Sequence, residues 1–242
     1  LPSSAFLIPA DRAVAARGDR RIRLLLMTDT AVLAPGGSER FLLNLASRLP
    51  RERYRITLVQ LHGACMPANG QPARQLPHVQ LQALPVHAVY DASGLRAWKA
   101  LRSMLREEHF DIVQSQHEKA DVLNALLPRR AGGVRISNRR DMGFNKSARL
   151  ARVFRMLNPR FDRVVAPARQ ILTGLAECEQ LDALRMVWIP NGVDTRRYCP
   201  STYQSRLDSR RALGLDEDAV VFGCVARLTE VKRHADLLQA FP

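Results

Sequence analysis

Two places in this sequence hold residues suited to binding a phosphorylated ligand. Gly36 and Gly37 lie between an apolar run and a helical pattern. Glycines in that position allow an anion to approach the free N–H groups of a helix N-terminus. Arg227 and Lys232 also lie between an apolar run and a helical pattern. Because arginine offers a planar fork and lysine a mobile point charge, the pair suits a diphosphate.

The other polar candidates share one position, at or directly after an apolar run of strand length: His117, Arg139, Arg140, Asp141, Asn191 and Gly192. Open parallel sheets bind ligands outside the carboxyl ends of their strands. We therefore expect these residues to line a ligand cleft. His117 could serve there as a hydrogen-bonding or acid–base group.

Each candidate also has a simpler structural interpretation. A Gly-Gly pair between a strand and a helix makes a turn more often than it binds a ligand. His117 could be an ordinary loop residue, and the triplet 139–141 a solvated charge cluster. Arg227 and Lys232 could be surface side chains. However, lysine is disfavoured at a helix N-terminus, and this misfit favours an anion beside Lys232.

Apolar runs of strand length alternate with helical patterns along most of the chain. The expected strands are 22–27, 54–61, 79–86, 110–116, 134–138, 161–167 and 186–190. The expected helices are 38–49, 94–108, 120–127, 146–157 and 168–177, the first of them capped by Ser38. This alternation implies right-handed βαβ units, and hence an α/β fold with a Rossmann-like parallel sheet.

The pattern divides the chain into a leader, a Rossmann-like N-terminal domain, a polar link and the start of a second Rossmann-like domain: 1–20, 21–190, 191–204 and 205–242. The last part is expected to contain a helix, a strand at 220–228 and a helix that begins near Lys232. The chain starts at leucine, and its final helical pattern has barely begun at the last residue. We therefore expect a fragment.

Composition limits the class of partner. Lysine and arginine number 37 against 23 acidic residues, a net charge of +14. The basic residues are spread out, without the tight run or aromatic interleaving of a nucleic-acid-binding arm. We therefore expect no nucleic acid, and favour phosphorylated ligands or an anionic membrane surface. The four cysteines lack zinc-site spacing and indicate free thiols in a reducing compartment.

Four motifs together resemble retaining glycosyltransferases of the GT-B fold, family 4: PGGSER (35–40), SQH (115–117), IPNGVD (189–194) and VARLTEVKRHADLLQAF (225–241). The resemblance covers residues 21–242 in element order. SNRRDMGF (137–144) is similar to bacterial members that build cell-surface polysaccharide or lipid-linked sugars.

The resemblance implies a role for each candidate. His117 would be the catalytic residue that faces the reacting sugar. Arg227 and Lys232 would hold the donor diphosphate beside Gly36 and Gly37. Five residues would line the cleft or contact the acceptor: Arg139, Arg140, Asp141, Asn191 and Gly192. The family implies a hexosyltransferase that needs no metal or cofactor, with a nucleotide-sugar donor and a glycan or lipid-linked acceptor. Its expected location is the cytoplasm, peripheral at the inner face of the cell membrane.

One departure from the family affects this expectation. The Glu-x₇-Glu motif that contacts the donor lies later in the family's second domain than the last residue of this sequence. We therefore expect an incomplete and poorly active enzyme. Two other functions stay open: a non-catalytic Rossmann-like module that binds an acceptor or partner, and a basic nucleic-acid-binding protein.

Overall fold

The computed structural model describes residues 21–33, 36–63, 78–129, 133–141 and 146–240. The expected leader, 1–20, lies outside the described residues. The chain divides into two units, Leu1–Gly192 and Val193–Pro242, which are treated separately below.

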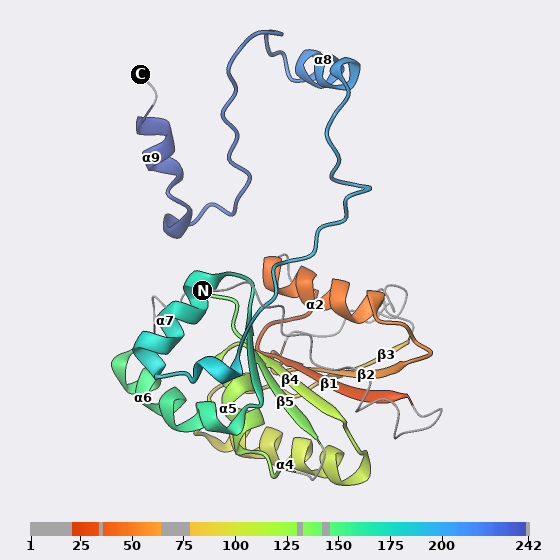
Figure 1. Ribbon diagram of the computed structural model, residues 1–242, viewed down its shortest axis with the longest axis vertical. Helices are drawn as coiled ribbons and strands as arrows, with labels where there is room; N and C mark the ends of the chain where they lie inside the picture. The colour runs from red at the N-terminus through yellow and green to blue at the C-terminus, as the bar shows by residue number, and fades with distance from the viewer. Residues whose placement is uncertain (1–20, 34–35, 64–77, 130–132, 142–145, 241–242) are drawn as a thin grey trace. The chain divides into compact units, whose positions relative to one another are not determined.

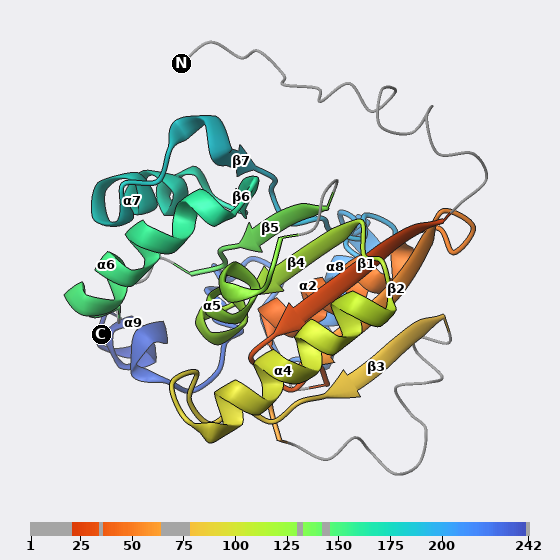
Figure 2. The ribbon, with the colours of Figure 1, turned by 90° about the horizontal axis from the view of Figure 1, so that it is seen from below.

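The first unit contains a seven-stranded parallel sheet in the order β3-β2-β1-β4-β5-β6-β7. Its strands are β1 Ile22–Thr28, β2 Tyr54–Gln60, β3 Val79–Ala83, β4 Ile112–Gln116, β5 Val134–Asn138, β6 Arg163–Ala166 and β7 Met186–Trp188. From β1 the chain builds outward through β2 to β3, then returns to the other side of β1 at β4 (Figure 2). The strand order therefore reverses between β1 and β4, the place where open sheets of this kind bind ligands.

Helices cover both faces of the sheet. They are α2 Gly37–Arg48, α4 Ala92–Glu107, α5 Glu118–Leu126, α6 Ala148–Leu157 and α7 Arg169–Glu179, with short 3₁₀ turns η1 Asn158–Arg160 and η2 Ala183–Arg185. Helix α2 lies on one face, and α4 and α5 lie on the other (Figure 1).

Strand β1 is buried on both faces, and its alternate side chains enter different cores. Leu24 and Leu26 pack with α2, whereas Leu25 and Met27 pack with α4 and α5. Because a strand buried on both faces has no polar side, it reads as an unbroken apolar run. The seven strands predicted in this unit, and the five helices between them, are confirmed within a few residues at their ends.

The predicted cap of the first helix is wrong by two residues. The N-cap of α2 is Gly36, in an extended conformation and without a side-chain cap. Ser38 therefore lies inside the first turn. Its carbonyl oxygen accepts a hydrogen bond from the side-chain amide of Gln116 at the end of β4.

The second unit contains α8 Tyr203–Ala212, the 3₁₀ turn η3 Glu230–Lys232 and α9 His234–Gln239. The strand predicted at 220–228 is not present. Its apolar side chains are exposed, with Val220 at 84%, Phe222 at 66% and Leu228 at 89%. A strand needs a neighbour to receive its backbone hydrogen bonds, and the described part of this unit contains no other strand.

Candidate functional site

The site begins where β1 and β4 end side by side. Thr28 pairs with Gln116 in register, so the next residues of both strands emerge at the same edge. His117 follows β4, and its Nδ1 lies 3.4 Å from the hydroxyl of Thr28. The backbone of His117 has a φ of 74°, in the left-handed region. Residues other than glycine seldom occupy that region, and such strain is concentrated at functional sites.

His117 also precedes helix α5 as its N-cap, but its side chain makes no capping hydrogen bond. Asp29, directly after β1, supplies the missing acceptor. Its carboxylate accepts hydrogen bonds from the backbone N–H of Lys119 at 2.7 Å and of Ala120 at 2.6 Å. Burial raises the pKa of Asp29 to about 7, although these two hydrogen bonds act to lower it. Sequence reasoning missed Asp29.

Burial also sets the charge of His117. Loss of contact with water lowers the pKa of His117, while the carboxylates of Glu39 and Asp141 oppose that shift. The imidazole is therefore largely neutral at pH 7, with one nitrogen that donates a hydrogen bond and one that accepts.

The two glycines at the start of α2 differ. A Cβ on Gly36 would lie 2.0 Å from a carboxylate oxygen of Glu39, which is 8% exposed. Gly36 is therefore explained by the close approach of Glu39. A Cβ on Gly37 would meet nothing within 4 Å, so packing within the described residues does not require glycine there.

Arg139 and Arg140 follow β5 and diverge. Arg139 turns inward and is 7% exposed. Its Nε lies 2.9 Å from Asp121, and its Nη atoms reach Glu179 at 3.4 Å and Asn158 at 3.2 Å. The solvated-cluster interpretation is therefore wrong for Arg139.

The partners of Arg139 complete a buried network with two positive and two negative groups: Asp121, Arg139, Lys146 and Glu179. Lys146 Nζ lies 2.5 Å from Glu179. Asp121, fully buried, accepts hydrogen bonds from the hydroxyls of Ser115 at 2.6 Å and Ser137 at 2.9 Å. We call these four charged residues the inner network. Burial raises the pKa of Asp121, and Arg139 opposes that rise.

Arg140 extends toward α2 instead. Its guanidinium lies 3.9 Å from the ring centroid of Phe41 and donates a hydrogen bond to the Asn191 side chain at 2.6 Å. Partial burial lowers its pKa from an ordinary value far above neutrality. The structure thus brings Arg140 and Asn191 together, residues that sequence reasoning placed at the ends of two different strands.

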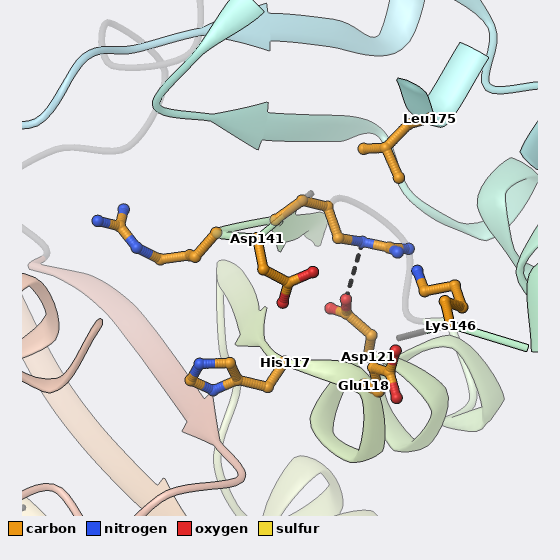
Figure 3. Close-up of a pocket in the computed structure, with 8 residues that line it drawn as sticks. His117, Glu118, Asp121, Asp141, Lys146 and Leu175 are labelled. Atoms are coloured by element: carbon orange, nitrogen blue, oxygen red, sulfur yellow. Dashed lines mark ion pairs between the residues drawn. The ribbon is translucent and has the colours of Figure 1, made fainter. Parts of the chain in front are cut away.

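A small pocket joins these groups, with a volume of about 20 Å³, enough for roughly one water molecule. It is lined by His117, Glu118, Asp121, Arg139, Arg140, Asp141, Lys146 and Leu175. Figure 3 shows His117 and Asp121 projecting from the start of α5, with the carboxylate of the exposed Asp141 near both. A sugar is too large for this pocket in the described state, so a sugar ligand would lie outside it.

Among the predicted residues of the first unit, Gly36, Gly37, Asn191 and Gly192 do not line this pocket. Gly192 is exposed and ends the first unit. Arg227 and Lys232 belong to the second unit, where both are exposed. Lys232 ends η3, and Arg233 separates it from the start of α9 at His234. Their predicted contact with phosphate stays a prediction.

With this geometry established, comparisons with known proteins identify the family. The model of glycosyltransferase family 4 matches residues 35–197, more than half of the chain. The chain therefore belongs to glycosyltransferase family 4, and its fold is the Rossmann-like α/β fold of GT-B glycosyltransferases. No curated protein matches the sequence.

Several solved structures share the fold. HepE (Alr3699) of Anabaena, in complex with UDP and glucose, has a TM-score of 0.70 and 21% identity over 91% of this chain and 57% of its own. A glycosyltransferase of Rickettsia africae has a TM-score of 0.68 and 14% identity over 91% of this chain and 56% of its own. Sucrose-phosphate synthase of Thermosynechococcus elongatus has a TM-score of 0.62 and 13% identity over 82% of this chain and 54% of its own. The chain thus spans little more than half the length of these proteins.

One further finding concerns membranes. Among the helices of the described residues, none is long and apolar enough to cross a bilayer.

Proposed function

We propose that this chain takes part in the transfer of a hexose from a nucleotide-sugar to a glycan or lipid-linked acceptor, with retention of configuration. The observation that carries the proposal is the strained, largely neutral His117 at the switch point of the sheet. The structure of HepE, a protein of the same fold, is a complex with UDP and glucose, which supports a UDP-sugar donor.

In the proposed reaction, the bond between the anomeric carbon and the donor phosphate oxygen breaks, the acceptor hydroxyl oxygen forms a bond to that carbon, and the hydroxyl proton goes to the departing diphosphate. His117 would hydrogen-bond the donor sugar near the reacting carbon and orient it. Arg227 and Lys232 would stabilise the negative charge on the departing diphosphate. Arg140 and Asn191, already joined by a hydrogen bond, would contact the acceptor.

The test is transfer from a panel of labelled nucleotide-sugars to lipid-linked and oligosaccharide acceptors. His117→Ala should abolish transfer while the protein stays folded. His87→Ala is the matched control, because the His87 side chain is 92% exposed and lies outside the pocket. Normal transfer by His117→Ala would contradict the role proposed for His117. Glycan binding without binding of any nucleotide-sugar would favour the non-catalytic module instead.

Metal independence is part of this proposal and needs its own test. Asp216 and Asp218 flank Glu217 in the second unit, a spacing at which two carboxylates can share a divalent ion. Glu217 already pairs with Arg211 at 3.1 Å. Transfer should survive exhaustive chelation, and restoration of lost activity by Mg²⁺ or Mn²⁺ would contradict metal independence.

Peripheral contact with an anionic membrane is supported by the exposed face of α6. Arg149, Arg152 and Arg155 are exposed there beside Val153 and Met156, which are 40% and 74% exposed. No acidic residue occurs from 147 to 161. Basic side chains with exposed apolar neighbours suit an anionic lipid surface. Co-sedimentation with anionic but not neutral vesicles, weakened by Gln at the three arginines, would support this contact.

A further inference from the structure

The junction between β4 and α5 is unusual because its backbone is strained and its helix has no cap of its own. His117, at this junction, has φ 74° and ψ 170°, and its side chain makes no capping bond. A left-handed residue other than glycine persists only where its surroundings hold it. Something other than His117 must therefore fix this junction.

Asp29 is the group that holds the junction. Each of its two carboxylate oxygens accepts one backbone N–H, from Lys119 and from Ala120, at 2.7 and 2.6 Å. The two residues that donate lie two and three positions after His117, whereas Asp29 lies about ninety positions earlier in the chain. The Lys119 side chain adds a second tie, because its Nζ donates to the carbonyl of Val86 at 3.1 Å.

The neighbour of Asp29 contacts His117 itself. Thr28 places its hydroxyl 3.4 Å from Nδ1 of His117 and 3.1 Å from the hydroxyl of Thr30. The end of β1 therefore fixes the backbone on the C-terminal side of His117 through Asp29 and contacts its ring through Thr28.

We propose that Asp29 is a positioning residue for His117: it fixes the start of α5 so that the imidazole stays beside Thr28. This proposal rests on the proposed function only for the catalytic role of His117. The contacts of Asp29 are present without a substrate. Removal of Asp29 frees the first turn of α5, and the ring leaves its half-buried position.

Asp91 provides a matched control for a carboxylate that caps a helix. It accepts hydrogen bonds from the N–H groups of Ser93 and Gly94 at the start of α4, at 2.8 and 3.0 Å. Helix α4 covers the same face of the sheet as α5 but contributes no residue to the pocket. A purely structural cap should behave as Asp91 does.

The experiment follows the imidazole of His117 by NMR during pH titration of wild type, Asp29→Asn and Asp91→Asn, with His117→Gln used for assignment. We expect the pKa of His117 to rise by about half a unit or more in Asp29→Asn, because the ring becomes more hydrated. Asp29 carries only part of its charge where His117 titrates, and loss of that partial charge alone would lower the pKa of His117, so a rise indicates movement of the ring. Asp91→Asn should leave it unchanged, and Asp29→Glu should restore part of the wild-type value.

Two results would overturn the proposal. One is an unchanged or lowered His117 pKa in a folded Asp29→Asn protein. The other is the same rise in Asp91→Asn. If Asp29→Asn fails to fold, the pH titration of the wild-type protein tests the proposal. The amide chemical shifts of Lys119 and Ala120 should then follow the ionisation of Asp29, and the ring chemical shifts of His117 should show an inflection at the same pH. Absence of that inflection counts against the proposal.

The titration of His117 uses no sugar donor or acceptor. Failure of the proposal for Asp29 is therefore distinguishable from failure of the proposed function. Absence of sugar transfer by the wild type would leave the titration result standing. An unchanged His117 titration would leave a catalytic role for His117 open and remove only the role of Asp29.

Discussion

Arg139 and Arg140 are adjacent in sequence and lie in opposite environments. Arg139 is buried in the inner network and bonded to Asp121, Glu179 and Asn158. Arg140 stacks on an aromatic ring of α2 and donates to the Asn191 side chain near the end of the first unit. The same type of side chain is thus part of the core in one position and partly exposed in the next.

Two other pairs show the same contrast. The Glu39 carboxylate occupies the space where a Cβ on Gly36 would lie, whereas no atom of the described residues lies within 4 Å of a Cβ on Gly37. Asp29 and Asp91 both cap a helix, but burial raises the pKa of Asp29 to about 7 while hydrogen bonds from Ser93 and Gly94 hold that of Asp91 near 2. Residue type decides which chemistry is possible, and the surroundings decide whether it serves the fold or a ligand.

The largest expected effect separates the two arginines. Arg139→Ala leaves two buried carboxylates short of a positive partner and should lower the free energy of unfolding by about 3–5 kcal/mol. Arg140→Ala should cost less than about 1 kcal/mol, because a partly exposed contact contributes little. Urea denaturation followed by circular dichroism measures both. Equal losses would show that the distinction between inward and outward arginines is wrong.

The next effect is a pH dependence at Asp29. A carboxyl whose folded pKa is raised stabilises the fold below its ordinary pKa, 3.8, and that contribution is lost as pH rises through about 7. From about pH 5 to about pH 8, the free energy of unfolding of wild type should fall by roughly 2–3 kcal/mol relative to that of Asp29→Asn. The pKa of Asp91 is lowered to about 2, so its contribution is lost only in acid. Denaturation at the two pH values should therefore show no such change between wild type and Asp91→Asn.

The sheet could be predicted because β1 and β2 are apolar runs buried on both faces, and the other strand-length runs alternate with helical patterns. Runs such as Leu24 to Met27 carry no polar side chain, and turn or helical signals separate them. The segment 220–228 is also mostly apolar, and its prediction as a strand was wrong. Composition shows that a segment can be a strand, but a neighbouring strand is needed to make it one.

The site could be predicted only as an edge of the sheet. His117 and Arg140 emerge there because parallel strands end together. The inward turn of Arg139 could not be predicted, since its partner Glu179 lies forty residues away. Asp29 carried no motif, and its partners lie about ninety residues away. A carboxylate directly after the first strand was the only available signal.

A smaller effect is expected at Gly36. Alanine there would place Cβ 2.0 Å from Oε2 of Glu39, so the Glu39 side chain must leave its buried position. We expect a loss of about 1–2 kcal/mol in the free energy of unfolding. The Glu39→Ala background should remove most of this loss, because the clash is then absent. An equal loss in both backgrounds would mean that backbone freedom, rather than Glu39, explains the glycine.

The smallest effect distinguishes a turn from a binding surface at Gly37. Alanine there meets no atom of the described residues within 4 Å and lies in the first turn of α2. It should raise the free energy of unfolding by a few tenths of a kcal/mol, about 0.3–0.8, because alanine restricts the unfolded chain and favours helix. If Gly37 admits a phosphate to the helix N-terminus, the same substitution should weaken nucleotide-sugar binding about tenfold, since the methyl group occupies that approach. Calorimetric titration of Gly37→Ala with UDP-glucose would show this weakening, and unchanged affinity would leave the glycine pair with a structural role alone.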